Sequence, residues 1–322
     1  MNSSGAVANG IGHPVRRKED FRLLTGKGSF ADDVFLLGLT HAVIVRSPHA
    51  HAHIQSIDKA AALVSPGVLA VLTGRDYLAD GLAPIPHGAG LMGPPDVAAR
   101  VRGSGPITTR DYPMASDRIR FVGEPVALVV AETIDQAKNA AELIEIAYEP
   151  LSAVVRAADA VKPGAPRLWE DAPDNLCIDI EVGDEAATAA AFASAAHIVR
   201  LDTWVQRVTG VPMEPRTTTA AYDTATGLYT LYSGSGRGVA KLRLDLAQVL
   251  GVPAEQVRCI CHDMGGNFGT RNFFYPEYAL LAWAAHRIGR PVKWTCERSE
   301  AFLSDYQGRD LTVVSAGAKI PH

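Results

Sequence analysis

The sequence predicts a fold that mixes strands and helices, either α+β or α/β, and three observations support this. Short apolar runs such as Pro125–Ala131 are typical of buried strands. Apolar residues at positions i, i+3, i+4, i+7 and i+10 from Tyr278 are typical of a helix with one buried face. The two patterns are interspersed at short spacing in a chain of 322 residues, a length that favours two domains.

The first unit is expected to run from Asp20 to Leu151, after a flexible lead at 1–19. It opens with the glycine-punctuated segment FRLLTGKGSFADD. Its further elements combine short strands with a few helices. In chain order we expect a strand at 42–45, a strand and a short helix within GVLAVLTGRDYL, the Pro/Gly-rich loop APIPHGAGLMGPP, the strand 125–131, a helix with Thr133 as N-cap, and a strand within LIEIAYEPL.

Residues 152–169 are expected to link this unit to a second one at 170–322, because Pro163, Gly164 and Pro166 interrupt regular structure. The second unit again mixes both element types. We expect helices at 185–195 and 240–250, strands at 197–205, 228–233 and 256–261, and a glycine turn running into a helix that ends at Gly289. The strand LTVVSAGA starts close to the end of the sequence, so this domain is expected to be incomplete.

Composition excludes several classes of protein. A net charge of -4, with basic residues scattered along the chain, gives no sign of a nucleic-acid partner. No stretch is long and apolar enough for a signal peptide core or a membrane span, which predicts a cytoplasmic protein. The four cysteines show no zinc or iron–sulfur spacing, so we expect them to be reduced and buried, with Cys259 and Cys261 packed in the core.

The most informative segment is the glycine-rich turn GGNFG at 265–269. Gly265, Gly266 and Gly269 permit positive φ and close approach of a ligand to the main chain. Amides before a helix favour an anionic or oxo group, although a plain strand-to-helix turn fits the spacing equally well. A second glycine turn, SGSGRG at 233–238, also lies between a strand and a helix, so one shared ligand becomes a stronger hypothesis.

Two other patterns each leave two interpretations open. His49, His51 and His53 alternate in SPHAHAHI, and on a strand they would share one face, as a metal-dependent hydrolase would need. A half-exposed strand without a metal is the simpler interpretation. In PMEPR, Glu214 and Arg216 form either a structural ion pair or a pair of polar groups that face a cleft, and the structural interpretation is favoured.

Six segments together carry a family resemblance. They are GKGSFADD, VRSPHAHAHI, FVGEPVALVVAETIDQAKNAAELIEIAYEPLSAVV, PMEPR, GVPAEQVRCICHDMGGNFGTRN and GRPVKWTCERSEAF, in family order from about Arg17 to Leu311. This set resembles the N-terminal part of the molybdenum cofactor-binding large subunit of the xanthine dehydrogenase, aldehyde oxidase and aerobic carbon monoxide dehydrogenase family. The resemblance implies an α+β fold, with an α/β hammerhead domain at 20–151 and a partial molybdopterin-binding domain at 170–322. It also assigns SPHAHA to the hammerhead scaffold.

The resemblance also implies a function. Such enzymes hold molybdenum through the dithiolene of a molybdopterin, often a cytosine dinucleotide, with no direct protein ligand. They oxidise an aldehyde or an N-heterocycle with oxygen from water, and the cofactor supplies the chemistry that side chains lack. Electrons leave through iron–sulfur clusters to FAD. The expected partners are therefore an iron–sulfur subunit, an FAD subunit, a polypeptide with the second molybdopterin domain, and a small-molecule substrate.

Site residues follow from the resemblance position by position. Gly265, Gly266, Asn267, Phe268 and Gly269 match the cofactor-binding turn of the family, whose amides would lie beside the apical oxygen of the molybdenum. Gly236 and Arg237 match the second cofactor-binding turn, where many relatives have glutamine in place of the arginine. Asn272 replaces a carboxylate that faces the substrate in many relatives.

No catalytic residue is identifiable in this sequence. The glutamate base of the family belongs to the C-terminal half that the sequence lacks, and Glu214, Glu277 and Glu300 do not match its place. The chain is therefore expected to be inactive alone. Two explanations stay open: one part of a split large subunit, or a truncated product, which as the alternative function would be a catalytically inactive scaffold or partner-binding fragment.

Overall fold

The computed structural model describes residues 16–87, 99–102 and 105–319. The loop expected at 83–95 lies partly outside them, as does most of the lead expected at 1–19. The α-helices are α1 (Asp20–Leu24), α2 (Ala60–Leu63), α3 (Gly74–Ala79), α4 (Ile134–Ala141), α5 (Ala157–Ala160), α6 (Glu185–Ser194), α7 (Val239–Leu250), α8 (Pro276–Ile288) and α9 (Arg298–Ser304). Short 3₁₀ helices are η1 (Ala31–Asp33), η2 (Ala254–Gln256) and η3 (Thr270–Asn272). No helix of these residues is long and apolar enough to cross a membrane.

The largest sheet has seven strands and contains strands of both expected units. Across the sheet these are β12 (Val257–Ile260), β11 (Leu228–Ser233), β10 (Thr217–Asp223), β13 (Val292–Thr295), β1 (Thr40–Arg46), β6 (Pro125–Ala131) and β3 (Val68–Thr73). The units join where β1 and β13 pair in parallel, with Thr40 opposite Val292 and His41 opposite Lys293. The two expected units therefore share one hydrogen-bonded sheet.

Buried side chains on both faces explain the apolar runs of the central strands. All seven residues of β6 are buried. On neighbouring β1, Ala42 and Ile44 face the main core, whereas Val43 and Val45 face a second core that includes α4. Helix α4 starts at the expected N-cap, because Thr133 accepts a hydrogen bond from the backbone N–H of Gln136.

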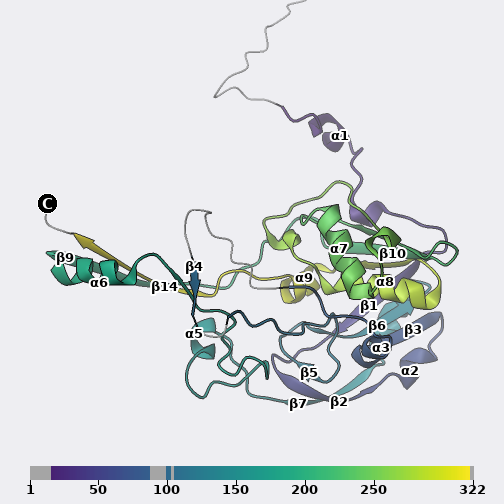
Figure 1. Ribbon diagram of the computed structural model, residues 1–322. Coiled ribbons are helices and arrows are strands. Elements are labelled where there is room, and N and C mark those ends of the chain that lie inside the picture. Colours follow the sequence, from purple (N-terminus) through teal and green to yellow (C-terminus); the bar gives the residue numbers. More distant parts are fainter. Residues whose placement is uncertain (1–15, 88–98, 103–104, 320–322) are drawn as a thin grey trace, which may run out of the picture.

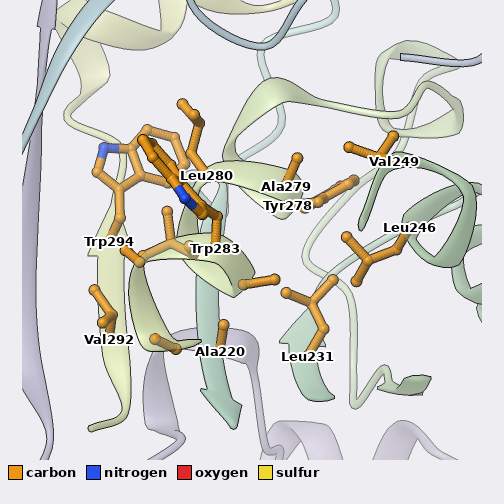
Figure 2. Packing of buried hydrophobic residues seen from close by; sticks show 14 of the residues in the cluster. Ala220, Leu231, Leu246, Val249, Tyr278, Ala279, Leu280, Trp283, Val292 and Trp294 are labelled. Atoms are coloured by element: carbon orange, nitrogen blue, oxygen red, sulfur yellow. The ribbon is translucent and has the colours of Figure 1, made fainter. Parts of the chain in front are cut away.

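The main core lies between helices α7 and α8 and the strands they cover (Figure 2). Leu246 of α7 and Trp283 of α8 are fully buried there, beside Leu231 of β11. Residues 277–285 of α8 are all buried, so burial includes the expected face at Tyr278, Leu281, Ala282 and Ala285 and extends beyond it. The helix is enclosed nearly all round because strands and α7 surround it. It ends as expected at Gly289, which has φ 68°.

Three small sheets complete the fold. They are β5 (Arg118–Ile119), β2 (Ala52–Asp58) and β7 (Glu145–Pro150); β4 (Ala99–Val101) and β8 (Ile180–Val182); and β9 (His197–Val205) and β14 (Leu311–Lys319). Figure 1 shows the β9–β14 ribbon and α6 reaching away from the rest of the molecule. Every residue of β9 is exposed, apolar ones such as Val199 and Trp204 included.

The four cysteines are free thiols, but the expectation that all are buried is wrong. Cys177 is exposed, Cys259 and Cys261 are half-buried, and only Cys296 is buried. The half-burial has a simple cause, because β12 is the edge strand of the large sheet and only one neighbour shields it. The strand also ends at Ile260, so Cys261 already lies outside it.

Candidate functional site

The two glycine turns predicted from the sequence lie against each other. The backbone N–H of Gly236 donates to the carbonyl of Arg271 at 2.9 Å. A Cβ on Gly236 would lie 2.3 Å from the Asn267 amide nitrogen and 2.5 Å from the Asn272 amide oxygen. A side chain at this position would displace the Asn267 and Asn272 side chains, so glycine is what allows their present close approach. The Asn267 and Asn272 side chains are themselves hydrogen-bonded at 2.9 Å.

The backbone of the first turn leaves donors available. Gly266 and Gly269 have φ of 123° and 86°, and Phe268 also adopts a positive φ of 49°. The backbone N–H groups of Gly266, Asn267 and Phe268 donate to no residue that the structure describes. The Phe268 side chain is 73% exposed. A non-glycine residue at positive φ beside free amides is the kind of strained geometry that concentrates at ligand sites.

The turn does not run straight into the long helix, which corrects the expectation. Helix η3 and the segment Phe273–Tyr275 separate Gly269 from Pro276, the first residue of α8. The amides of the turn therefore do not cap α8, and the dipole of that helix does not act on them. The amides are available as donors because the glycines give the turn its backbone conformation.

Arg237 is held in place rather than free to move. Its Nε donates to a carboxylate oxygen of Asp245 at 2.7 Å, and its Nη1 donates to the carbonyl of Asn272 at 3.2 Å. Asp245 is 1% exposed and also pairs with Lys241. The guanidinium therefore joins α7 to η3, the short helix that follows the glycine turn at 265–269, and it adds a fixed positive charge beside Asn272.

Glu214 and Arg216 do not pair with each other, so the expectation of an ion pair between them is wrong. Glu214 bonds to the glycine turn, where its Oε2 accepts from the backbone N–H of Gly265 at 2.7 Å. Arg216 is 3% exposed and pairs with Glu277 at 2.6 Å and with Asp305 at 2.7 Å. The prolines on either side of Glu214 fix φ, so the two side chains leave the segment toward different partners.

A buried charge network behind the turn was not found from the sequence. Glu277 also pairs with Arg46 of β1 at 2.7 Å, and Arg46 pairs with Glu300 at 2.7 Å. Burial opposes the ionisation of Glu277, but Arg216 and Arg46 outweigh burial and lower its pKa. A charged residue inside an otherwise apolar helix, as in PEYALLAWAA, was the signal that could have revealed it.

The same network reaches the glycine turn through an aromatic ring. The Arg216 guanidinium lies 3.9 Å from the centroid of the Tyr275 ring, a cation–π contact. The Tyr275 hydroxyl donates to the carbonyl of Thr270 at 2.8 Å, and Thr270 directly follows the turn. A continuous line of contacts therefore connects the buried charges to the candidate site.

The three histidines do not share one face of a strand, which corrects that expectation. Strand β2 begins at Ala52, so only His53 lies on it. His51 is buried, with its Nδ1 2.8 Å from the carbonyl of Ser152, and the His49 ring packs against Tyr148 at 4.8 Å. Among residues 16–87, 99–102 and 105–319, no group of three His, Cys, Asp or Glu side chains is arranged to hold a metal.

Family models match two consecutive parts of the chain. Residues 25–152 match the aldehyde oxidase and xanthine dehydrogenase a/b hammerhead domain, and residues 168–319 match the molybdopterin cofactor-binding domain. The chain belongs to the xanthine dehydrogenase, aldehyde oxidase and carbon monoxide dehydrogenase family. The carbon monoxide dehydrogenase large chain of Hydrogenophaga pseudoflava is 35% identical over 306 residues, 90% of this chain and 36% of that protein.

Solved structures of the family share the α+β fold of this chain. Quinoline 2-oxidoreductase from Pseudomonas putida 86 has a TM-score of 0.78 and 35% identity, with 92% of this chain and 36% of that chain covered. Carbon monoxide dehydrogenase from Oligotropha carboxidovorans has a TM-score of 0.83 and 30% identity, with 97% of this chain and 38% of that chain covered. The chain thus spans about a third of the length of the family members it matches.

Proposed function

We propose that this chain forms one wall of the cofactor site in a molybdenum hydroxylase that oxidises an aldehyde or an N-heterocycle, with water as the oxygen source. Membership of the family supports the molybdenum cofactor. The cofactor is a molybdopterin, proposed as the cytosine dinucleotide. Quinoline 2-oxidoreductase, a relative named for a heterocyclic substrate, supports this class of substrate.

The proposal depends on one observation. The two glycine turns lie against each other, beside three backbone amides that have no partner among the described residues. Gly236 lies against Asn267, and the amides of Gly266, Asn267 and Phe268 donate to no described residue. Preorganised backbone N–H groups are suited to hold an oxo or anionic group without reorganisation. The donor set therefore fits a cofactor that presents oxygen atoms and is itself held elsewhere through its pterin.

The residues around the turns have distinct roles in this proposal. Molybdopterin-bound molybdenum supplies oxidation and the transfer of oxygen from water. Gly266, Asn267 and Phe268 orient it through their amides, while Gly265, Gly269 and Gly236 permit the close approach of the backbone. Arg237 sets the position of Asn272 through its carbonyl. Asn272, which is exposed, would contact the substrate with an uncharged amide.

None of the three glutamates near the site is proposed as the catalytic base. Glu277 is buried between Arg46 and Arg216, and Glu300 pairs with Arg46. Glu214 accepts backbone hydrogen bonds. Each of these carboxylates already binds other groups of the fold. The catalytic base is therefore proposed to come from a second molybdopterin-domain polypeptide.

The exposed β9–β14 ribbon supports the proposal that the chain binds partner polypeptides. Two strands alone are marginally stable in water, yet this ribbon carries exposed apolar side chains, which are Ile198, Val199, Leu201, Trp204, Val205, Leu311, Val313 and Val314. A surface of this kind is typical of protein contacts. We propose an iron–sulfur subunit and an FAD subunit as further partners. A catalytically inactive fragment that only binds partners is the alternative function that the same ribbon favours.

Copurification tests the proposal and separates it from the alternative. The tagged chain is isolated from its host, its molybdenum is measured by elemental analysis, and its bound polypeptides are identified by mass spectrometry. Near-stoichiometric molybdenum together with a second molybdopterin-domain polypeptide and iron–sulfur and flavin subunits is the expected result. Partners without molybdenum would support the inactive alternative, and a bare chain without metal would contradict both.

A further inference from the structure

We infer that Glu214 is a positioning residue that fixes the glycine turn in the shape that leaves its amides free. The inference rests on the proposed function in one respect only, which is the identity of the group that the turn binds. Glu214 makes three hydrogen bonds that reach the start of the turn, at Gly265, and the helix η3 directly after it, at Arg271. A fourth hydrogen bond joins it to η1 of the hammerhead domain. No other carboxylate near the turn bonds to its backbone in this way among the residues that the structure describes.

Two of these bonds hold the start of the turn. The Oε2 of Glu214 accepts from the backbone N–H of Gly265 at 2.7 Å, and the backbone N–H of Glu214 donates to the Gly265 carbonyl at 3.2 Å. A Cβ on Gly265 would lie 2.6 Å from the Glu214 Cβ, so the two backbones touch. A carboxylate that accepts an amide is a charge-assisted bond, stronger than one between neutral groups.

The third bond holds η3, which directly follows the turn. The guanidinium of Arg271 donates to the backbone carbonyl of Glu214. Arg271 is 3% exposed and pairs with no carboxylate among the described residues. A buried charge in this position depends on the polar groups that it does reach. Loss of the Glu214 geometry would therefore release the start of the turn and η3 after it.

The second carboxylate oxygen connects the turn to the other half of the protein. Its Oε1 accepts from the backbone N–H of Ala31, the first residue of η1, at 3.3 Å. A Cβ on Gly234, in the second glycine turn, would lie only 3.5 Å from Oε2. The carboxylate of Glu214 therefore lies where η1 and both glycine turns meet, and both of its oxygens are needed as acceptors.

Hydrogen exchange tests this inference without any cofactor. Glu214→Gln keeps the shape but replaces one acceptor oxygen with an NH₂ group, which cannot accept from an amide. We expect exchange of the Gly265 amide, followed within residues 263–270, to become about tenfold faster in Glu214→Gln, and faster still in Glu214→Ala. Exchange in β6 should stay unchanged, which separates a local effect from general loss of stability. The matched control is Met213→Ala, because that side chain is 87% exposed.

Glu214→Asp tests whether the charge of this side chain or its length holds the turn. It retains the negative charge but withdraws the oxygens by one C–C bond, about 1.5 Å. Exchange near the wild-type rate in Glu214→Asp, with fast exchange in Glu214→Gln, would mean that charge alone holds the turn and would overturn the geometric inference. Unchanged exchange at 263–270 in Glu214→Gln would overturn it as well.

Metal content then distinguishes this inference from the proposed function. In the copurified complex we expect Glu214→Gln to retain at least several-fold less molybdenum than the wild type, while Met213→Ala retains as much as the wild type. If the wild-type chain holds no molybdenum but exchange at 263–270 responds as expected, the proposed function fails and the positioning role of Glu214 stands.

Discussion

Arg216 and Glu277 form an ion pair that solvent does not reach, with 2.6 Å between Nη1 and Oε2 and side-chain exposures of 3% and 1%. Glu277 uses its other oxygen to bind Arg46, at 2.7 Å. Arg46 lies on β1 of the hammerhead domain, whereas Arg216 and Glu277 belong to the molybdopterin-binding domain. One carboxylate therefore joins the two domains at the line where they share a sheet.

Removal of this carboxylate should destabilise the whole protein. Glu277→Gln leaves two buried guanidinium groups with fewer counter-charges, and breaking a buried pair in this way costs about 3–5 kcal/mol. We expect a loss of that size in the free energy of unfolding, measured with urea. Glu297→Gln is the matched control, because its pair with Lys138 is exposed to solvent and should contribute little. Equal effects of the two variants would contradict a special role for Glu277.

The glycine turn should not tolerate a branched side chain. Gly266 has φ 123°, and a Cβ there would lie 3.0 Å from the Cβ of Pro212 and 3.2 Å from the Phe268 ring. We expect Gly266→Val to abolish molybdenum retention in the assembled complex, with hammerhead folding preserved. Gly81→Val has a similar strain, at φ 74°, but open space around it and no contact with the site. Wild-type molybdenum content in Gly266→Val would refute the assignment of the turn.

Glu124 should make stability depend on pH. Burial raises its pKa from 4.5 to about 7, with Asp111 adding to the rise and hydrogen bonding from the Arg120 backbone opposing it. The folded state therefore holds this proton more tightly than the unfolded state. The resulting stability is complete below pH 4.5 and is lost as the pH rises from about 4.5 to about 7. A rise of this size corresponds to about 3 kcal/mol.

Urea unfolding at several pH values between 5 and 8 checks this. The wild type should lose stability across that range, and Glu124→Gln should have a flatter profile because glutamine does not titrate. Asp111, whose pKa burial also raises, stays in both proteins, so the difference between them reports Glu124 together with its interaction with Asp111. Glu170→Gln is the control, since its side chain is 84% exposed. Parallel profiles for wild type and Glu124→Gln would rule out titration of Glu124.

The sequence predicted local elements well where one physical signal dominates. Strands β6, β9 and β11 have the bounds expected from their apolar runs and flanking breakers. Strand β10, TTTAAYD, was missed because threonine and alanine give no apolar run, although it is central to the large sheet. The pairing of β1 with β13 joins residues about 250 positions apart, and local patterns carry no signal for such contacts.

For the candidate site, the sequence predicted the segments but not the contacts between them. Glycine spacing predicted both turns, because positive φ and close approach of the backbone both favour one residue type, glycine. Their mutual contact through Gly236 and Asn267 depends on tertiary packing, as do the different partners of Glu214 and Arg216. Spacing alone therefore predicted these segments as a candidate site and could not assign the bonds between them.

The thiols should differ sharply in reactivity. Cys177 is exposed, whereas burial raises the pKa of Cys259 and of Cys296 to about 12. The thiolate is the reactive form, so the half-buried Cys259 and the buried Cys296 should both react slowly at neutral pH. We expect iodoacetamide at pH 7.5 to modify Cys177 first, with Cys296 protected until the protein unfolds, as read by peptide mass spectrometry. Urea-unfolded protein gives the reference rates, and equal labelling of Cys177 and Cys296 in the native chain would show that the sheet opens at the end of β13, an interior strand.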